Sequence, residues 1–409
     1  MRVSIIASGM GQCGTLTREA QERLACAELI IGAKRIIAEY DSLKAEKIAA
    51  VAAEQIVNCI KDAMAEEIVV AMSGDTGFYS GTKSLLMQLD TFIQEGNQVE
   101  VIPGVSSVQY MASRIMRPWQ DVKLASAHGK FCNVVGTVLS NRETFFLTGG
   151  VLTVKVILEK LFEVGLGNAE VYVGERLSYS DERVTHGKVL ELVNQTFDKL
   201  AVMWVVRDEI FIDRNSTIRD DDFIRGKVPM TKGEVRSVVC DYFNVKDNDI
   251  IYDIGAGTGS VAIKLALKYP MATVKAIEVN EDAIDLIHQN RENLQAYNMS
   301  VFHGEASELL AEFEAPNHVF IGGSKGNLEQ ILDTILAINP DASVLISAVT
   351  METVVEATNL CKKYFGCDIE ITQISVSRTK AIGRYNMLKA ESPIFLIGRR
   401  KVQTCLILD

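Results

Sequence analysis

The second half of the chain alternates short apolar runs with segments of helical spacing. Such runs of five to ten residues fall at 250–254, 273–278, 299–303, 318–322, 343–349, 368–377 and 393–399. Between two of them, apolar residues recur every three or four positions, as at Leu328, Ile331, Leu332 and Ile335. Apolar runs of this length predict buried strands, and the intervening spacing predicts amphipathic helices. This order predicts a mostly parallel sheet covered by helices on both faces.

The first half repeats a strand, a turn of small residues and a helix. Apolar runs at Val3–Ala7, Glu67–Met72 and Gln98–Ile102 each lead into a glycine-containing turn. The pattern predicts an α/β domain with a polar cleft. A fully apolar run, 200–206, ends this half, and the polar segment 207–225 has no apolar periodicity. We therefore place the domain boundary near residues 210–215, which gives domains 1–210 and 211–409.

A glycine-rich turn follows the first strand of the second half. The sequence Asp253-Ile-Gly-Ala-Gly-Thr-Gly-Ser260 links an apolar run to a helical pattern. Its glycines allow the backbone to approach a ligand closely, and the free N–H groups at the helix start favour a negative group. The next strand ends on Glu278, 23 positions after Gly255. An acid at about this distance, roughly 20 residues, grips ribose hydroxyls in nucleotide-binding folds. The spacing Gly-x-Gly-x-Gly resembles motif I of class I S-adenosylmethionine (SAM) methyltransferases.

Several further segments resemble the methyltransferases that act on tetrapyrroles. Segments 73–79 (SGDTGFY), 101–107 (VIPGVSS) and 29–35 (LIIGAKR) resemble three elements of the tetrapyrrole (precorrin) methylases. Segments 229–236 (PMTKGEVR) and 320–324 (FIGGS) resemble the decarboxylating precorrin methyltransferases. The order of the two halves is that of the fused family of cobalamin biosynthesis. Two segments depart from the family pattern. The N-terminal turn reads Ser8-Gly-Met-Gly-Gln12 where the family has Gly-Pro after its first glycine, and Lys325 stands where the family's second-domain loop has a glycine.

This resemblance implies an N-terminal tetrapyrrole-methylase α/β domain followed by a Rossmann-like class I SAM methyltransferase domain. It implies methylation of C5 of a precorrin or cobalt-precorrin by the first domain. It also implies methylation of C15, with loss of the ring C acetate carboxylate, by the second. SAM is the implied cofactor and S-adenosylhomocysteine (SAH) the product. The reduced macrocycle is itself nucleophilic and can act as an electron sink, so no metal and no particular catalytic acid or base is assigned.

The predicted cofactor-binding residues follow the turns at the strand ends and the family segments. In the first half they are Ser8, Gly9, Gly74, Asp75, Thr76, Phe78, Pro103, Ser106 and Ser107. In the second half they are Thr231, Asp253, Gly255, Ala256, Gly257, Thr258, Gly259, Glu278, Glu305, Ala306, Gly322 and Gly323. A substrate with many carboxylates also requires cationic side chains. The candidates are Arg114, Arg117, Lys130, Lys232, Arg236, Lys325, Arg378, Lys380 and Arg384, each of which has solvated surface charge as its alternative role.

The composition of the chain limits the kinds of partner that we expect the protein to bind. The formal net charge of −11 argues against a broad electrostatic grip on nucleic acid. No run reaches the roughly 18 apolar residues of a membrane span, and the strand-like N-terminus does not predict a signal peptide. The eight cysteines are scattered singly, which predicts buried thiols in a cytoplasmic protein. The family resemblance implies a homo-oligomer.

Two alternatives stay open at this stage. The first is a class I methyltransferase that acts on RNA or protein and carries an unrelated N-terminal domain. The missing Asn/Asp-Pro-Pro-Tyr/Phe motif and the acidic charge disfavour this alternative. The second is a SAM- or tetrapyrrole-binding regulatory protein without turnover, which two intact cofactor sites in one chain would disfavour.

Overall fold

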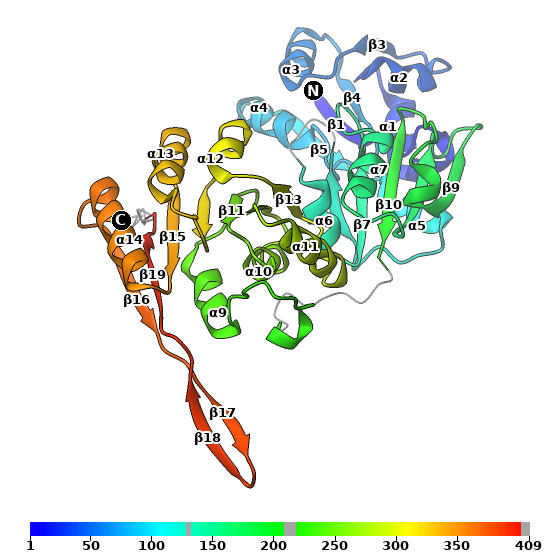
Figure 1. Ribbon diagram of the computed structural model, residues 1–409. Coiled ribbons are helices and arrows are strands. Elements are labelled where there is room, and N and C mark those ends of the chain that lie inside the picture. Colours follow the sequence, from blue (N-terminus) through cyan, green and yellow to red (C-terminus); the bar gives the residue numbers. More distant parts are fainter. Residues whose placement is uncertain (128–131, 208–217, 402–409) are drawn as a thin grey trace. The chain divides into compact units, whose positions relative to one another are not determined.

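The computed structural model describes residues 1–127, 132–207 and 218–401, which form two compact units. The first unit comprises Met1–Cys132, Asn141–Glu163 and Gly167–Asp208, and the second comprises Asn133–Ser140, Val164–Leu166 and Glu209–Asp409. Figure 1 shows the elements of both. The predicted boundary near residues 210–215 lies outside the described residues.

The first unit begins with a five-stranded parallel sheet of order β3-β2-β4-β1-β5. Its strands are β1 (Arg2–Ala7), β2 (Leu29–Gly32), β3 (Glu46–Ala49), β4 (Glu67–Met72) and β5 (Gln98–Ile102). Its helices are α1 (Arg18–Cys26), α2 (Lys34–Ile37), α3 (Ala53–Asp62) and α4 (Thr82–Gln94), with the 3-10 turns η1 (Cys13–Thr15) and η2 (Ala38–Tyr40). Successive side chains of β1 point to opposite faces, so that Ile5 packs under α3 and α4 while Ile6 packs under α1 and α2.

A second sheet of the first unit has the order β6-β7-β10-β8-β9. Its strands are β6 (Lys123–Ser126), β7 (Glu143–Leu147), β8 (Glu170–Glu175), β9 (Arg183–Lys188) and β10 (Ala201–Val206). The helices of this region are α5 (Ser107–Arg114), α7 (Val154–Glu163) and α8 (Val189–Leu192). All residues of β10 are buried, as the uninterrupted apolar run predicted. Trp204 lies in its centre and donates its indole N–H to Glu143 Oε2 over 2.8 Å.

The second unit is built on a seven-stranded sheet of order β13-β12-β11-β14-β15-β19-β16. Its strands are β11 (Ile250–Ile254), β12 (Thr273–Glu278), β13 (Met299–His303), β14 (His318–Ile321), β15 (Ser343–Ala348), β16 (Glu370–Ile374) and β19 (Ile394–Arg399). The first five strands are parallel, and β19 runs antiparallel between β15 and β16. The strand order reverses direction at β11, which creates the crevice where ligands bind in open α/β sheets.

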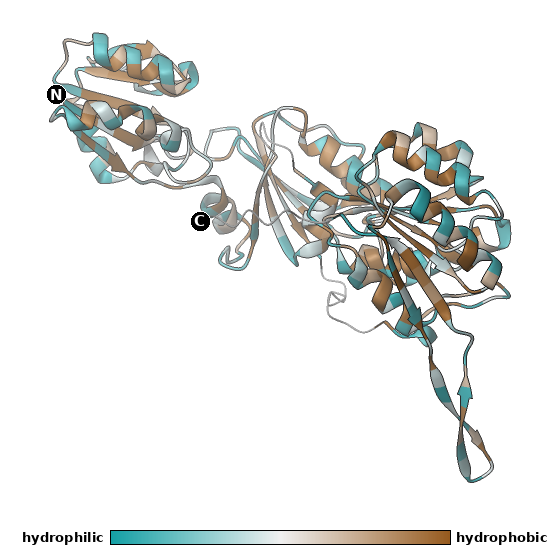
Figure 2. Ribbon diagram, turned by 90° about the vertical axis from the view of Figure 1, so that its left-hand side faces the viewer, coloured by the Kyte–Doolittle hydropathy of each residue, from teal (hydrophilic) through white to brown (hydrophobic). Residues whose placement is uncertain are grey.

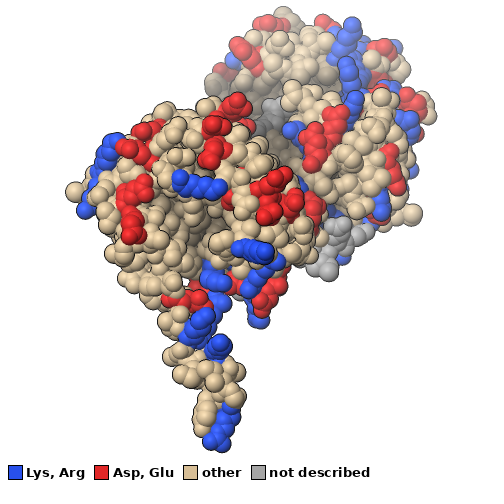
Figure 3. Space-filling model, in the orientation of Figure 1, with Lys and Arg blue, Asp and Glu red and all other residues tan. Residues whose placement is uncertain are grey.

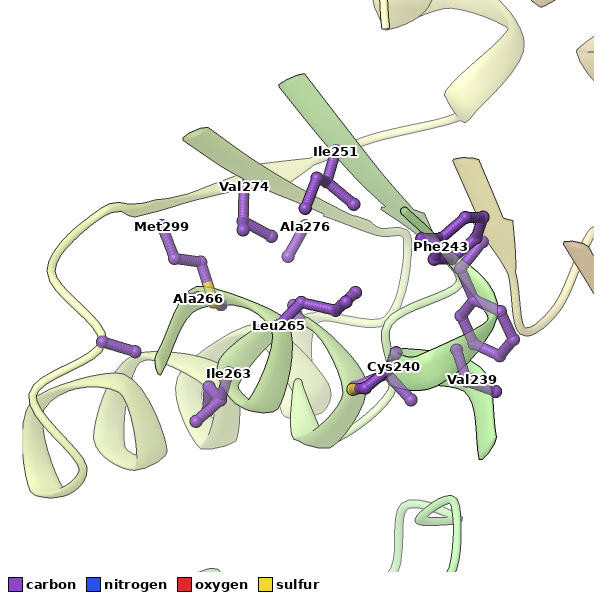
Figure 4. Close-up of a cluster of buried hydrophobic side chains, with 14 of the residues drawn as sticks. Val239, Cys240, Phe243, Ile251, Ile263, Leu265, Ala266, Val274, Ala276 and Met299 are labelled. Carbon is purple, nitrogen blue, oxygen red and sulfur yellow. The ribbon is translucent and has the colours of Figure 1, made fainter. Parts of the chain in front are cut away.

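Helices cover both faces of this sheet. They are α9 (Gly233–Tyr242), α10 (Ser260–Lys268), α11 (Glu281–Asn293), α12 (Ala306–Leu309), α13 (Leu328–Ile338) and α14 (Met351–Phe365), with α6 (Val134–Ser140) and the 3-10 turns η3 (Asp220–Asp222) and η4 (Leu310–Glu312) also in this unit. The core under α9, α10 and α11 is drawn in Figure 4, where Leu265 and Ala266 of α10 face Val274 and Ala276 of β12. In Figure 2 the sheet strands are largely hydrophobic, as buried parallel strands require. The predicted α/β fold is confirmed.

One predicted element is different in the structure. The run expected as a strand at 368–377 ends at Ile374, and the segment between this run and the last one forms a β-hairpin of β17 (Ser377–Ile382) and β18 (Tyr385–Ala390). The turn contains Gly383, whose φ of 59° suits glycine. Nearly every hairpin residue is exposed. The hairpin lacks the apolar alternation by which a strand is predicted, because it has no buried face.

The expectation of uniformly buried cysteines was wrong. Cys240 and Cys361 are buried in the second unit, whereas Cys26 and Cys367 are exposed. Cys26 ends α1 on its solvent side, and Cys367 follows the turn at Gly366 that ends α14. None of the helices in the described ranges is long and apolar enough to cross a membrane.

Candidate functional site

A cavity of about 660 Å³ lies at the carboxyl ends of β11 to β15 in the second unit. The glycine turn, the end of β12 and the loops after β13 and β14 contribute to its wall, together with the segment before α9. Its predicted cofactor residues are Thr231, Gly255, Ala256, Gly257, Glu278, Glu305, Ala306, Gly322 and Gly323. Loops far apart in sequence therefore converge at the edge where parallel strands deliver ligand-binding groups.

The glycine turn needs glycine for two separate reasons. Gly255, Gly257 and Gly259 all have left-handed backbones, with φ of 68°, 57° and 74°. A Cβ atom on Gly255 would lie 2.5 Å from the carbonyl oxygen of Gly323, so this glycine permits the turn to contact the loop after β14. A Cβ on Gly257 would lie 3.0 Å from the carbonyl oxygen of Pro229. The turn is thus shaped by backbone contacts on two sides.

Glu278 braces this turn from the neighbouring strand. Its Oε2 accepts a hydrogen bond from the N–H of Gly257 over 2.8 Å. Its Oε1 accepts from the N–H groups of Val279 and Asn280 over 2.9 and 3.0 Å. The residue is only 8% exposed but lines the cavity. A carboxylate has about four acceptor positions, and three of those of Glu278 are occupied, so it retains about one for a ligand hydroxyl.

Asp253 lies beneath the turn and does not line the cavity. Its Oδ2 accepts from the N–H of Ala262 in the first turn of α10 over 2.8 Å. Burial, with a smaller contribution from nearby Glu278, raises the pKa of Asp253 to about 7 against the opposing effect of the Ala262 hydrogen bond. Its Oδ1 and the hydroxyl of Thr258 are buried without a hydrogen-bond partner among the described residues. Asp253 therefore supports the turn from below, and Thr258 and Gly259, which belong to the turn, likewise lie off the cavity wall.

Lys325, which stands where the family has a glycine, adopts a backbone conformation typical of glycine. Its φ of 47° is left-handed, so lysine here keeps a backbone conformation that glycine adopts without strain. Lys325 lines the cavity together with Glu278, Glu281 and Glu305, and it is the one cation among the described lining residues. The described wall thus combines one cation with three carboxylates.

The other cationic candidates of this unit do not line the cavity. Arg236 is fully buried, with Nη2 3.1 Å from Asp220 Oδ1 and its guanidinium over the ring of Phe223. Its Nη1 donates to the carbonyl of Thr231 over 2.8 Å, so Arg236 holds a cavity-lining segment in place. Burial lowers the pKa of Arg236.

The remaining candidates lie near or on the hairpin. Arg378 pairs with Glu234 over 2.5 Å, and Arg384 stacks on Tyr385 at the hairpin turn. Lys232 precedes α9, and Lys380 is exposed on β17. The structure does not bring these four side chains to the cavity wall.

A second cavity, of about 550 Å³, lies within the first unit. Turns after β1 and β4 form one side of it, and the ends of β7, β8 and β10 form the other. Its predicted cofactor residues are Gly9, Gly74, Phe78 and Ser107. The turns after β1 and β4 are joined by reciprocal backbone hydrogen bonds between Gly9 and Gly74, of 3.1 and 2.9 Å.

The other predicted residues of the first unit do not line the cavity. Asp75 ties two loops together, because Oδ1 accepts from the N–H of Gly104 over 3.0 Å and Oδ2 from that of Gly77 over 2.8 Å. Ser106 caps α5 through the N–H of Gln109. Ser8 donates its hydroxyl to the carbonyl of Met72. Thr76 and Pro103 also lie off the wall.

Sequence reasoning selected other cations than those that line this cavity. Arg114 pairs with Glu182 over 2.7 Å and Arg117 with Glu143 over 2.9 Å, and neither lines it. Lys130 lies outside the described residues. The lining cations are Arg35 and Lys199. Arg35 is the last residue of segment 29–35, which resembles the tetrapyrrole methylases. That resemblance could have identified Arg35 from the sequence.

Comparison with known proteins assigns the family. Residues 222–400 match the model of the precorrin methyltransferase domain, and residues 2–193 match that of the tetrapyrrole (corrin/porphyrin) methylases. Cobalt-precorrin-6B C(15)-methyltransferase (decarboxylating) of Salmonella typhimurium is 30% identical over 186 residues, which cover 45% of this chain and 96% of the relative. The chain belongs to the precorrin methyltransferases.

Other precorrin methyltransferases match a longer or a similar share of the chain. Precorrin-6Y C(5,15)-methyltransferase (decarboxylating) of Sinorhizobium sp is 26% identical over 335 residues, which cover 80% of this chain and 78% of the relative. The crystal structure of precorrin-6Y C5,15-methyltransferase from Geobacter metallireducens GS-15 is 32% identical, covers 44% of this chain and 94% of its own, and gives a TM-score of 0.42. The protein is a methyltransferase, and its family uses SAM as methyl donor.

The cavity of the second unit has groups that suit that cofactor. Glu278 offers an acidic acceptor to a ribose, and the left-handed glycines of the turn keep side chains out of the space beside it. Among the residues that the structure describes, no group of three or more His, Cys, Asp or Glu could hold a metal ion.

Proposed function

We propose that this precorrin methyltransferase is bifunctional and acts in cobalamin biosynthesis. The N-terminal domain, 1–210, methylates C5 of a precorrin or cobalt-precorrin. The C-terminal domain, 211–409, methylates C15 and removes the carboxylate of the ring C acetate. The long match to a C(5,15)-methyltransferase supports two activities in one chain. Relatives of half this length that are named for C(15) methylation and decarboxylation support the division.

The observation that carries this proposal is that each unit has its own cavity, bordered by turns that follow its parallel strands. Each cavity is bordered by turns with left-handed glycines, which are Gly9 and Gly74 in the first unit and Gly255 and Gly257 in the second. SAM, when bound, supplies an electrophilic methyl group. The protein's task is then to hold a nucleophilic ring carbon in line with it and to exclude water.

In the second cavity we assign the cofactor to the glycine turn and Glu278. Glu278 accepts a hydrogen bond from a ribose hydroxyl, and the turn holds the rest of the cofactor against backbone. Lys325 binds a substrate carboxylate, because it is the cation that the described wall offers to an anionic ligand. Arg236 acts indirectly by fixing Thr231.

We also propose that the protein is a cytoplasmic homo-oligomer and that the β17–β18 hairpin joins its copies. The hairpin exposes Ile382, Tyr385, Met387 and Leu388, each by about half or more. It contains no Asp or Glu between residues 377 and 390, and Figure 3 shows its lysine and arginine side chains. A second copy suits this basic, apolar hairpin because the chain as a whole carries a net charge of −11.

The direct test is incubation of the full chain with SAM and either a precorrin-6Y or its cobalt form, followed by mass spectrometry. Addition of two methyl groups with loss of one carbon dioxide supports the bifunctional assignment. Binding of SAH and substrate without turnover would favour a regulatory protein instead, and methylation without decarboxylation would remove the second half of the proposal.

A further inference from the structure

The cavity of the first unit is positively charged in an acidic protein. Its described lining residues include Arg35 and Lys199 but no aspartate or glutamate. The whole chain, by contrast, has 53 acidic and 42 basic residues. The remaining wall is formed by backbone at glycines and by apolar or hydroxyl side chains. Such a wall offers favourable electrostatic partners only to a negative group.

Arg35 is held in this wall by neutral hydroxyl groups. Its Nη1 lies 2.5 Å from the hydroxyl oxygen of Tyr179, and its Nη2 donates to Ser73 Oγ over 3.2 Å. It has no ion pair among the described residues, whereas Arg114 and Arg117 are each neutralised by a glutamate. The guanidinium is therefore oriented but keeps its charge available, as a carboxylate-binding arginine requires.

The turn that carries Tyr179 is strained. Arg176 and Ser178 both have left-handed backbones, with φ of 46° and 73°. The N–H of Ser178 donates to Glu182 Oε2 over 2.6 Å, and its hydroxyl donates to the carbonyl of Met10 over 2.9 Å. These bonds lock the turn against the loop after β1. Left-handed non-glycine residues concentrate at functional sites, where surrounding contacts maintain them.

Tyr179 also packs tightly against the loop after β1. A Cβ atom on Gly11 would lie 2.4 Å from the Tyr179 hydroxyl oxygen, so the phenol packs directly against backbone. The position of this hydroxyl, and through it that of Arg35, is thus fixed by elements far apart in sequence. Tyr179 is a positioning residue for Arg35.

We propose that Arg35, oriented by Tyr179 and assisted by Lys199, binds a ligand carboxylate in the first cavity. This inference rests on the proposed function, which brings two carboxylate-bearing ligands to the cavity. One is the tetrapyrrole, through its acetate or propionate arms, and the other is SAM, through its amino-acid carboxylate. Both present the same chemistry to a guanidinium.

The test compares Arg35→Gln, Arg35→Lys and Tyr179→Phe with the parent in the full chain. Arg18→Gln is the matched control, because Arg18 is a surface arginine of the same unit whose side chain is 92% exposed. Calorimetry measures affinity for SAH and for 5′-methylthioadenosine, which lacks the amino-acid carboxylate. Mass spectrometry of the products measures the KM for the precorrin substrate in the methylation proposed for the first unit, which releases no carbon dioxide. Thermal melting confirms that each variant is folded.

Loss of one charge-assisted hydrogen-bonding partner predicts about a tenfold effect in Arg35→Gln. A tenfold rise in the substrate KM, with SAH binding unchanged, assigns the carboxylate to the tetrapyrrole. A tenfold loss of SAH affinity at one site, with 5′-methylthioadenosine unaffected, assigns it to the cofactor. Arg35→Lys is expected to restore part of the effect and Tyr179→Phe to reproduce part of it.

Arg35→Gln behaving like Arg18→Gln in both assays would overturn the inference, as would an equal loss with both nucleosides. Failure of the proposed function would be visible earlier and differently. In that case the parent chain itself would neither bind SAH nor methylate a precorrin.

Discussion

Glu278 Oε2 accepts a hydrogen bond from the backbone N–H of Gly257 over 2.8 Å. The acid at the end of β12 is thereby joined to the middle glycine of the turn that follows β11. The two features that most clearly identified the second site in the sequence are thus in direct contact, and the acid shapes the turn as well as facing the cavity.

Replacement of Glu278 by alanine is expected to weaken SAM binding at the second site and to leave the first site unchanged. The lost charge-assisted hydrogen bond to a ribose hydroxyl costs about 1.5–3 kcal/mol. Calorimetry with SAH on the full chain would show one weakened site of two. Glu281→Ala is the control, since Glu281 lines the same cavity on the first turn of α11. Unchanged affinity in Glu278→Ala would exclude Glu278 as the ribose ligand.

Asp253 is expected to make stability depend on pH. Its pKa is raised by burial from an ordinary value of 3.8 to about 7, so the folded state holds a proton that the unfolded state releases. Below about pH 4 the carboxyl group is protonated in both states, and the free energy of unfolding is not reduced. As the pH rises through 7, the free energy of unfolding falls by on the order of 1–4 kcal/mol. The parent should therefore lose stability relative to Asp253→Asn between pH 5 and 8, measured by urea unfolding.

The exposed Asp247→Asn, in the loop before β11, serves as the control for this pH series. A constant difference between the parent and Asp253→Asn across the range would show that Asp253 is ionised throughout.

Arg236→Met is expected to be strongly destabilising. The substitution removes a fully buried cation and leaves Asp220, whose side chain is 9% exposed, without its closest partner. Removal of one member of a buried pair costs about 3–5 kcal/mol. Because Arg236 also holds the carbonyl of Thr231, SAM affinity at the second site should fall as well. Urea unfolding and calorimetry measure the two effects.

The partly exposed Arg378 provides the comparison for Arg236. Arg378→Met should cost no more than about 1 kcal/mol, as is usual for a surface pair. Equal costs for the two arginines would contradict the buried, structural role of Arg236.

How far the sequence predicts this protein can be judged from particular residues. The glycine turn and Glu278 were predictable because both lie in one βαβ segment, where local spacing determines position. The cationic residues that line the cavities were not predictable in this way. Arg114 and Arg35 are equally basic in sequence, but Glu182 neutralises the first, and the fold brings the second to the cavity. Such pairings join distant segments and leave no local pattern. The β17–β18 hairpin escaped prediction because none of its faces is buried.

Shortening the hairpin is expected to lower the number of copies in the oligomer. Replacement of residues 378–389 by a short glycine-serine turn removes its exposed apolar side chains and four cations. Light scattering of the eluted protein should then show a smaller species than the parent, with both SAH sites retained. Lys44→Ser, which changes one exposed cation in the first unit, controls for charge alone. An unchanged mass of the assembly would exclude the hairpin as the contact between copies.

The division of labour between the two domains is tested most directly by the product of Gly257→Arg. Gly257 has a φ of 57°, and a Cβ there would lie 3.0 Å from the carbonyl oxygen of Pro229, so arginine distorts the turn and fills the cofactor space. Gly81→Arg is the control, because Gly81 has an ordinary backbone and open space around it. Mass spectrometry after incubation with SAM and a precorrin substrate gives the result. The account predicts that Gly257→Arg adds one methyl group and releases no carbon dioxide, while the parent and Gly81→Arg add two and release one. Decarboxylation by Gly257→Arg would place that reaction in the first domain and contradict the account.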